Sequence, residues 1–241
     1  MKAEWIAGPG LARRELWAMA AGSFGLGLLT GGVALALALM TNEPAFPESG
    51  PDVARYCVAV AALPTLAVVV TVARDWRRGE VRGAGDWLRR IGATLLVAGI
   101  LPLVAGLLGT DAVVRVLAGY LLAPCLVSLA AAFTFAAPER RSTDDTDDTE
   151  DAMGGLGARH APLQMGLGLL AFLGYFAPTL GYMLVSTVGR AIHPPTGCAS
   201  CVTAGQSAGL GTLFLVIVLG LGVCAGSLVG LWGAWLRGSV I

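Results

Sequence analysis

The chain has 241 residues, of which 56% are hydrophobic and only 13% are charged, and its mean hydropathy is +0.73. Soluble globular chains carry about 25% charged residues, so this sequence has too little polar material to cover the surface of a soluble domain. The composition therefore excludes a cytosolic enzyme, a nucleic-acid-binding domain and a disordered tail protein. The formal net charge of zero gives no indication of a polyanionic partner. We expect an integral membrane protein whose first partner is the lipid bilayer.

Six continuous apolar segments are long enough to cross a bilayer. A helix needs about 20 apolar residues to span the roughly 30 Å hydrocarbon core. The third and fourth segments are almost directly joined, which predicts a tight helical hairpin. A membrane β-barrel would instead need many short strands of alternating polarity. The expected fold is therefore all-α, a polytopic bundle of six transmembrane helices over residues 17–40, 53–73, 91–109, 112–137, 163–188 and 207–236.

The distribution of basic residues predicts the orientation of these helices. If the N-terminus lies inside, the loops and termini on the inner side hold 13 of the 16 Lys and Arg residues, as the positive-inside rule requires. We therefore expect a multi-pass protein of the cell membrane with both termini cytoplasmic. A cleaved export signal at Arg13 and Arg14 is the alternative, but the apolar run 17–40 exceeds the about 7–15 residues of such a signal.

An acidic segment divides the chain. Residues 142–151 are all Ser, Thr, Asp or Glu, and such a segment has no apolar surface to bury. We expect a four-helix part over 1–137, a disordered cytoplasmic linker over 138–161 and a two-helix part over 162–241. A calcium loop is disfavoured, because the run lacks the central Gly and the register of an EF-hand. We expect neither a metal site nor a cofactor.

The second inner loop contains two similar sequences, Asp75-Trp76-Arg77-Arg78 and Asp86-Trp87-Leu88-Arg89-Arg90. Trp at headgroup depth with Arg just beyond it is the ordinary anchor of a membrane helix end, and the arginines attract anionic lipid. We interpret the loop as a lipid anchor. A docking patch for an acidic partner or a nucleotide is the alternative, but no glycine-rich phosphate loop accompanies it.

The predicted spans lack the residues of ion-coupled transport. Ionisable side chains at mid-membrane mark ion pathways and proton relays, and no Asp, Glu, Lys or His lies deep in these segments. Arg55 and Arg115 are the charges within them, and each lies close to an end. This pattern disfavours proton-coupled transport and charged substrates. It is compatible with a pore or carrier for a small neutral solute, lined by hydroxyls and backbone carbonyls.

Four spans contain a proline near the middle, which removes a backbone donor and favours a kink. Two of these prolines end similar sequences, Gly119-Tyr120-Leu121-Leu122-Ala123-Pro124 and Gly174-Tyr175-Phe176-Ala177-Pro178. Broken helices in corresponding halves can mark a transporter binding site. Because the likeness is short, we favour packing over a substrate site. The predicted kinks lie at Pro64, Pro102, Pro124 and Pro178.

Glycines at four-residue spacing predict close helix contacts. The last span carries Gly222, Gly226 and Gly230, and the first carries Gly27 and Gly31. In lipid, small residues at this spacing let helix backbones approach closely. We expect the first and last helices to pack tightly, either with each other or across a homodimer.

Two cysteines, Cys198 and Cys201, form a CxxC in the outer loop before the last span, and His193 precedes them. Outside the cytosol such a pair can form a disulfide, or the first thiol can be activated. The position resembles that of the reactive pair in membrane thiol oxidoreductases of the DsbB and vitamin K epoxide reductase type. Those families use a second outer cysteine pair, where this chain offers only Cys57. Three ligands fall short of a closed zinc site. We favour a structural staple.

The leading functional hypothesis is a non-catalytic multi-pass membrane protein, either a small neutral-solute pore or carrier or a membrane subunit of a larger complex. No catalytic residues are assigned under this hypothesis. The alternative is an extracytoplasmic thiol-disulfide oxidoreductase that uses Cys198 and Cys201.

Overall fold

The structure, a computed structural model, describes residues 13–41, 50–81, 83–108, 118–136, 155–192, 216, 220 and 222–237. This part of the chain is helical and contains no strand, which confirms the expected all-α class for the described residues. Its elements, in chain order, are α2 (Arg13–Thr41), α3 (Gly50–Arg77), α4 (Ala84–Leu108), the π-helical turn η1 (Ala118–Leu122), α6 (Ala123–Phe135), α7 (Gly155–Ile192), the π-helical turn η3 (Gly222–Gly226) and α9 (Ser227–Arg237).

Five helical segments are long and apolar enough to cross a membrane: Arg14–Thr41, Val53–Arg77, Ala84–Val104, Ala118–Phe135 and Ala161–Ser186. They correspond to the first five predicted spans. Of the sixth, 207–236, the structure describes Val216, Gly220 and the residues from Gly222 onward, which belong to η3 and α9. The predicted hairpin turn between the third and fourth spans, at 109–112, lies outside the described residues.

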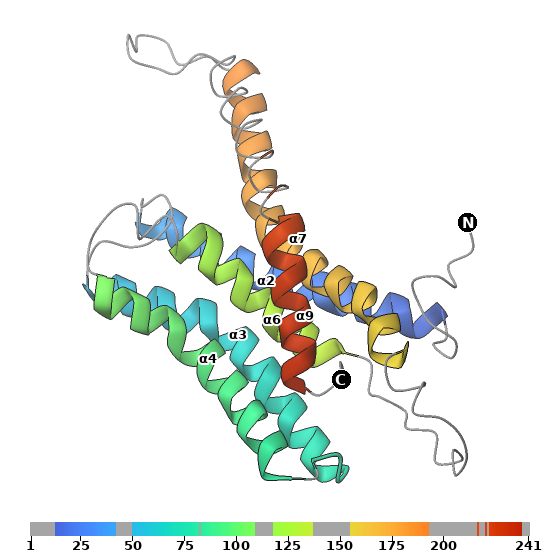
Figure 1. The fold of residues 1–241 in the computed structure, drawn as a ribbon. Helices are drawn as coiled ribbons and strands as arrows, with labels where there is room; N and C mark the ends of the chain where they lie inside the picture. Colours follow the sequence, from blue (N-terminus) through green and yellow to red (C-terminus); the bar gives the residue numbers. More distant parts are fainter. Residues whose placement is uncertain are drawn as a thin grey trace.

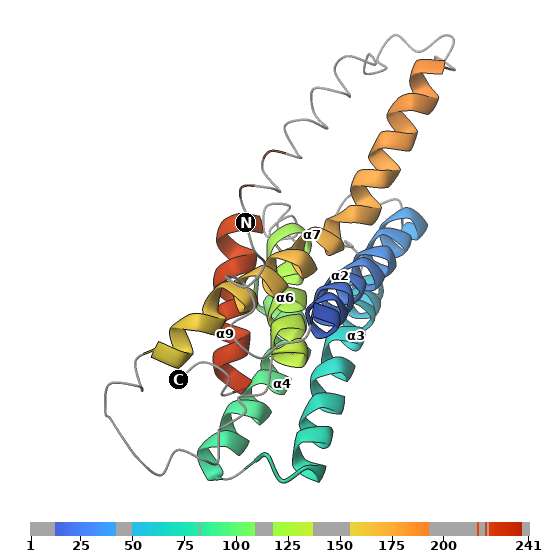
Figure 2. The same cartoon turned by 90° about the vertical axis from the view of Figure 1, so that its right-hand side faces the viewer.

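Helix α6 lies at the centre of the bundle and packs against α2, α3, α4, α7 and α9, while α7 packs against α2, α6 and α9 (Figures 1 and 2). Helix α7 is 38 residues long and contains both Pro162 and Pro178. Both views show α7 changing direction between its yellow first half and its orange second half, which extends beyond the other labelled helices. Proline inside a helix is the usual cause of such a bend. The bend separates the first half of α7, which packs against the other helices, from the second half.

The start of α7 differs from the predicted boundary of the linker. The helix begins at Gly155, inside the expected linker 138–161. Leu163 and Leu167 are buried against neighbouring helices, and tertiary packing of this kind extends a helix beyond what local sequence favours. The acidic run 142–151 lies outside the described residues.

A glycine-terminated turn ends α3 and leads into α4. Gly79 has a φ of 68°, in the left-handed region that glycine adopts without strain. Its N–H bonds to the carbonyl of Trp76 at 2.9 Å, and the N–H of Glu80 bonds to the carbonyl of Asp75 at 3.0 Å. This pair of bonds is the Schellman motif, which satisfies the last carbonyls of a helix. The motif fixes the short α3–α4 connection and places the end of α3 beside the start of α4.

The glycines of the first span pack against α7. A side chain at Gly27 would collide with the carbonyl of Ala171, and one at Gly31 would collide with the carbonyl of Tyr175. Both obstacles are backbone atoms, which have no alternative rotamer. Glycine at these two positions is therefore what allows α2 and α7 to lie in backbone contact.

The glycines of the last span also pack against α7. A Cβ atom at Gly222 would lie 3.0 Å from the ring of Phe172, and one at Gly226 would lie 2.9 Å from the Cβ of the same residue. At Gly230 it would lie 2.8 Å from the Cα of Gly168. We expected the two glycine ladders to meet each other or a second copy. In the described residues they instead share one partner, because α7 presents Ala171 and Tyr175 to α2, and Gly168 and Phe172 to the last span.

Candidate functional site

The site begins with a carbonyl group that its own helix leaves without a donor. Residues 118–122 form the π-helical turn η1, in which each carbonyl accepts from the N–H five residues later. For Gly119 that residue is Pro124, which has no N–H. The carbonyl of Gly119 therefore needs a donor from elsewhere, inside a bundle where an unpartnered carbonyl is costly.

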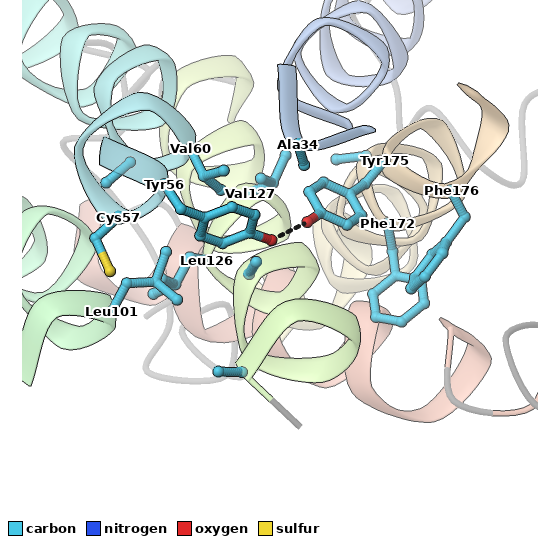
Figure 3. Close-up of a cluster of buried hydrophobic side chains, with 14 of the residues drawn as sticks. Ala34, Tyr56, Cys57, Val60, Leu101, Leu126, Val127, Phe172, Tyr175 and Phe176 are labelled. Carbon is cyan, nitrogen blue, oxygen red and sulfur yellow. Dashed lines mark hydrogen bonds between the residues drawn. The ribbon is translucent and has the colours of Figure 1, made fainter. Parts of the chain in front are cut away.

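Tyr175 of α7 supplies this donor. Its hydroxyl lies 3.2 Å from the carbonyl oxygen of Gly119 and 3.4 Å from the hydroxyl of Tyr56 on α3, as Figure 3 shows for the tyrosine pair. Because the proton of Tyr175 points to Gly119, Tyr56 donates to the oxygen of Tyr175. Tyr56 is 2% and Tyr175 is 4% exposed. The result is a buried chain of two hydroxyls and one carbonyl that joins α3, α7 and η1; we call it the tyrosine chain.

The two similar proline-ended sequences meet at this point. The rings of Tyr120 and Phe176 stack with their centroids 6.2 Å apart, and the ring of Tyr175 meets Phe176 edge to face at 5.4 Å. The likeness noticed in the sequence therefore corresponds to a direct contact between η1 and α7. Three of the four tyrosines of the protein, Tyr56, Tyr120 and Tyr175, lie in this region. The fourth, Tyr182 on the second half of α7, is 48% exposed.

Apolar side chains enclose the tyrosine chain. Tyr56 and Tyr175 belong to one buried cluster, which also includes Val60, Leu101 and Val127 (Figure 3). In such surroundings hydrogen bonds are strong and charges are disfavoured. The arrangement offers donors and acceptors without a charge, which suits hydrogen bonding to a small neutral molecule. No group of three His, Cys, Asp or Glu side chains placed to hold a metal ion occurs among the described residues.

A second polar cluster lies at the other end of the helices. Asp75 at the end of α3 is 0% exposed, and its carboxylate is paired with Arg90 near the start of α4 and with Arg237, the last residue of α9. Arg237 donates from Nη2 to Oδ1 at 3.2 Å and from Nε to Oδ2 at 3.3 Å. Two guanidinium groups supply more hydrogen-bond donors to the two oxygens of this buried carboxylate than one partner alone would.

Arg237 also closes the end of α6. Its Nη1 donates to the carbonyl oxygens of Phe133, Thr134 and Ala136 at 3.3, 3.1 and 2.7 Å. The last carbonyls of a helix lack intrahelical donors and carry partial negative charge, so a cation is stabilising there. Arg90 in turn donates to the carbonyl oxygen of Arg237 at 3.3 Å. This arginine clamp, formed by Asp75, Arg90 and Arg237, joins α3, α4, α6 and α9.

The clamp corrects part of the lipid-anchor interpretation. Arg90 is buried and paired with Asp75 inside the bundle, so it does not anchor the protein to headgroups. The two similar sequences place some residues inside the bundle and others on its surface. Successive residues of a helix point about 100° apart, so neighbours in sequence face different surroundings. Arg74, Arg77 and Arg78 are exposed, and the lipid-anchor interpretation stays a prediction for these three.

The remaining predicted residues are placed as follows. Pro64 and Pro102 lie within α3 and α4, Pro178 lies within α7, and Pro124 lies in the first turn of α6 directly after η1. The structure describes three free thiols, Cys57 buried, Cys125 half-buried and Cys224 exposed. Arg115, His193, Cys198 and Cys201 lie outside the described residues.

The arginine clamp and the pairing of Tyr56 with Tyr175 were not predicted from the sequence. A signal for the clamp existed, since Asp75 is an acidic residue at the end of a span beside arginines. Its second arginine partner lies 162 positions away, however, which no local pattern reveals. The proline-ended likeness was the signal for the tyrosine chain.

Comparison with known proteins adds no relative. No family model matches the chain, and neither a curated protein nor a solved structure matches it.

Proposed function

We propose that this chain is a non-catalytic, multi-pass protein of the cell membrane that carries small uncharged solutes, with the tyrosine chain as their polar contact point. The observation that supports this most directly is the hydrogen bond from Tyr175 to Gly119 at a proline-interrupted helix. In transporters, interrupted helices form the substrate and ion sites, and their freed backbone carbonyls are ligands there. The hydroxyl of Tyr175 can release the carbonyl of Gly119 and form a hydrogen bond with a solute instead.

The charges of the described residues favour an uncharged solute. Tyr56 and Tyr175 pack within a cluster of buried apolar side chains. The charged side chains that are buried among the described residues, Asp75 and Arg90, lie elsewhere, in the arginine clamp. There Asp75 has two arginine partners. A charged solute at the tyrosine chain would lose its hydration without meeting an opposite charge, which is costly in a low-dielectric interior.

The exchange is energetically modest. A buried hydrogen bond between neutral groups contributes about 0.5–1.5 kcal/mol net, so a solute that offers one donor and one acceptor can replace the bond between Tyr175 and Gly119 at little cost. The bonded groups belong to different elements, η1 and α7. Opening the bond therefore separates two helices locally rather than unfolding one.

The proposal includes the orientation of the helices in the membrane. Six spans with both termini cytoplasmic put the arginine clamp and the Gly79 turn on the inner side, where 13 of the 16 basic residues of the chain would lie. Glu80→Cys in the same exposed turn tests this, in a variant whose five native cysteines are replaced by serine. A membrane-impermeant maleimide should label it in inverted vesicles and leave it unlabelled in intact cells. Labelling in intact cells would overturn the orientation.

Solute flux tests the function. Purified protein is reconstituted into liposomes, and the entry of glycerol and urea is followed by stopped-flow light scattering. We expect faster entry than in protein-free liposomes, and a reduction by about tenfold in Tyr175→Phe, which removes the hydroxyl alone. Tyr182→Phe is the matched control, because this tyrosine lies on the same helix and is exposed.

Two results would overturn the proposal. One is flux no faster than through protein-free liposomes, and the other is a Tyr175→Phe variant that carries solute as the wild type does. If the first were accompanied by stoichiometric co-purification with other membrane proteins, the role of a membrane subunit would replace that of a carrier.

A further inference from the structure

Gln164 is a buried amide without hydrogen-bond partners. It lies in the first half of α7, its side chain is 0% exposed, and neither Oε1 nor Nε2 is hydrogen-bonded to another residue of the described chain. Buried polar groups are almost always partnered, because the alternative is the full cost of desolvation. A glutamine amide has two donors and one acceptor oxygen, so Gln164 leaves an unusually large number of hydrogen-bonding groups without partners.

A second unpartnered polar group lies at about the same level of the bundle. Ser23 of α2 is 0% exposed and its hydroxyl also lacks a hydrogen bond to the described residues. Gly27 of α2 faces Ala171 of α7, and the two helices run in the same direction. One turn earlier on α2 places Ser23 level with Leu167, within a turn of Gln164. Ser23 on α2 and Gln164 on α7 are therefore two polar groups without partners at a similar depth in the bundle.

Gln164 is also related to the tyrosine chain through the geometry of α7. It precedes Tyr175 by 11 residues, which is three turns, so the two side chains lie about 20° apart around the helix and about 16 Å apart along it. Gly168 and Ala171 occupy the positions between them and contact the backbones of α9 and α2. The same face of α7 therefore carries a polar group, two small residues and a second polar group.

We infer that Gln164, together with Ser23, forms a second, inner binding site for a small uncharged molecule that both donates and accepts hydrogen bonds. Water is the smallest molecule of this class, and amides of the urea type and small polyols are others. The amide offers such a molecule both a donor and an acceptor, and Ser23 adds a hydroxyl. The role of the site in transport rests on the proposed function, whereas its occupancy does not.

The composition of the chain makes the site directly observable. The only glutamines are Gln164 and Gln206. Protein labelled with ¹⁵N-glutamine and embedded in lipid nanodiscs therefore has two side-chain amide signals, and the one that is lost in Gln164→Leu belongs to Gln164. We expect magnetisation transfer from water protons to this amide. If the transported solute also binds, titration with urea or glycerol should shift the signal saturably.

These results separate the two sources of the bound molecule. Water transfer without a saturable shift identifies water as the occupant, and a saturable shift identifies the solute. Ser23→Ala should weaken either effect, whereas Met165→Leu, a change of similar size on the adjacent residue of α7, should not. A Gln164 amide that shows neither water transfer nor a shift overturns the inference.

Flux measurements distinguish this inference from the proposed function. If both hold, Gln164→Leu should reduce urea flux by about tenfold while Met165→Leu retains it. If wild-type protein carries no solute yet the Gln164 amide responds to water or urea, the proposed function fails and the site stands. If the protein carries solute and the Gln164 amide is silent, the site fails and the proposed function stands.

Discussion

Arg237, the last residue of α9, holds the carboxylate of Asp75 near the end of α3 through two hydrogen bonds of 3.2 and 3.3 Å. The same side chain closes the end of α6 through three carbonyl groups. Arg237 therefore links α9 to α3 and α6, which are the helices of the second and fourth predicted spans. Since these spans are far apart in sequence, the clamp forms only when the whole bundle has assembled.

Asp75→Asn should destabilise the protein strongly. The substitution leaves Arg90 and Arg237 buried without their carboxylate, and breaking a buried ion pair in this way costs about 3–5 kcal/mol. Asp86→Asn is the control, because its partnership with Arg89 is partly exposed and contributes only about 0–1 kcal/mol. Denaturant unfolding in detergent micelles measures both. Equal midpoints for the two variants would show that the clamp does not stabilise the fold.

Two adjacent glycines should respond oppositely to alanine. Gly31→Ala places a methyl group against the backbone of Tyr175, which cannot move aside, and should lower the unfolding free energy by about 1–3 kcal/mol. At Gly32 nothing lies within 4 Å of a Cβ atom, so Gly32→Ala should be neutral or stabilise the helix by about 0.5–1 kcal/mol. Thermal unfolding in detergent compares them. Loss of stability in both variants would contradict the close contact of α2 with α7.

Pro124→Ala should weaken the dependence of the fold on Tyr175. Alanine restores an N–H that can bond to a carbonyl of the preceding turn, including that of Gly119. In a double-mutant cycle, Tyr175→Phe should therefore cost less in the Pro124→Ala background, with a coupling of about 0.5–1.5 kcal/mol. Additive effects on the unfolding free energy would mean that the tyrosine does not compensate for the proline.

The outer cysteine pair should behave as a stable disulfide. If Cys198 and Cys201 form a structural staple, maleimide should label them only after reduction, and their labelling in intact cells should be the same after mild oxidant and after a quinone. Mass spectrometry of the peptide that contains both residues measures this. A pair whose labelling cycles with the added oxidant would instead support the thiol oxidoreductase.

The sequence was sufficient for the class and for most of the helices. Continuous apolar runs predict spans because length and hydropathy are local properties, and five of the six runs correspond to helices long enough to cross a membrane. The glycine spacing likewise indicated close packing at Gly27 and Gly226. It did not indicate the partner, because which helix fills a small-residue face depends on the whole arrangement.

The candidate sites were less accessible from sequence for the same reason. Tyr56 and Tyr175 are 119 positions apart, and nothing near either one specifies the other. The start of α7 at Gly155 was missed because a glycine-rich stretch disfavours a helix locally, while burial of Leu163 and Leu167 favours it in the folded protein. Pairwise contacts between distant helices are properties of the fold, and hydropathy does not encode them individually.

The contact of α2 with α7 has a consequence for biosynthesis. Helix α2 precedes in sequence the partner that fits against Gly27 and Gly31 by more than a hundred residues. In a membrane, lipid chains would cover this face of α2 until α7 inserts and displaces them. We therefore expect that a chain cut short before Gly155 leaves the glycine face of α2 without its helix partner.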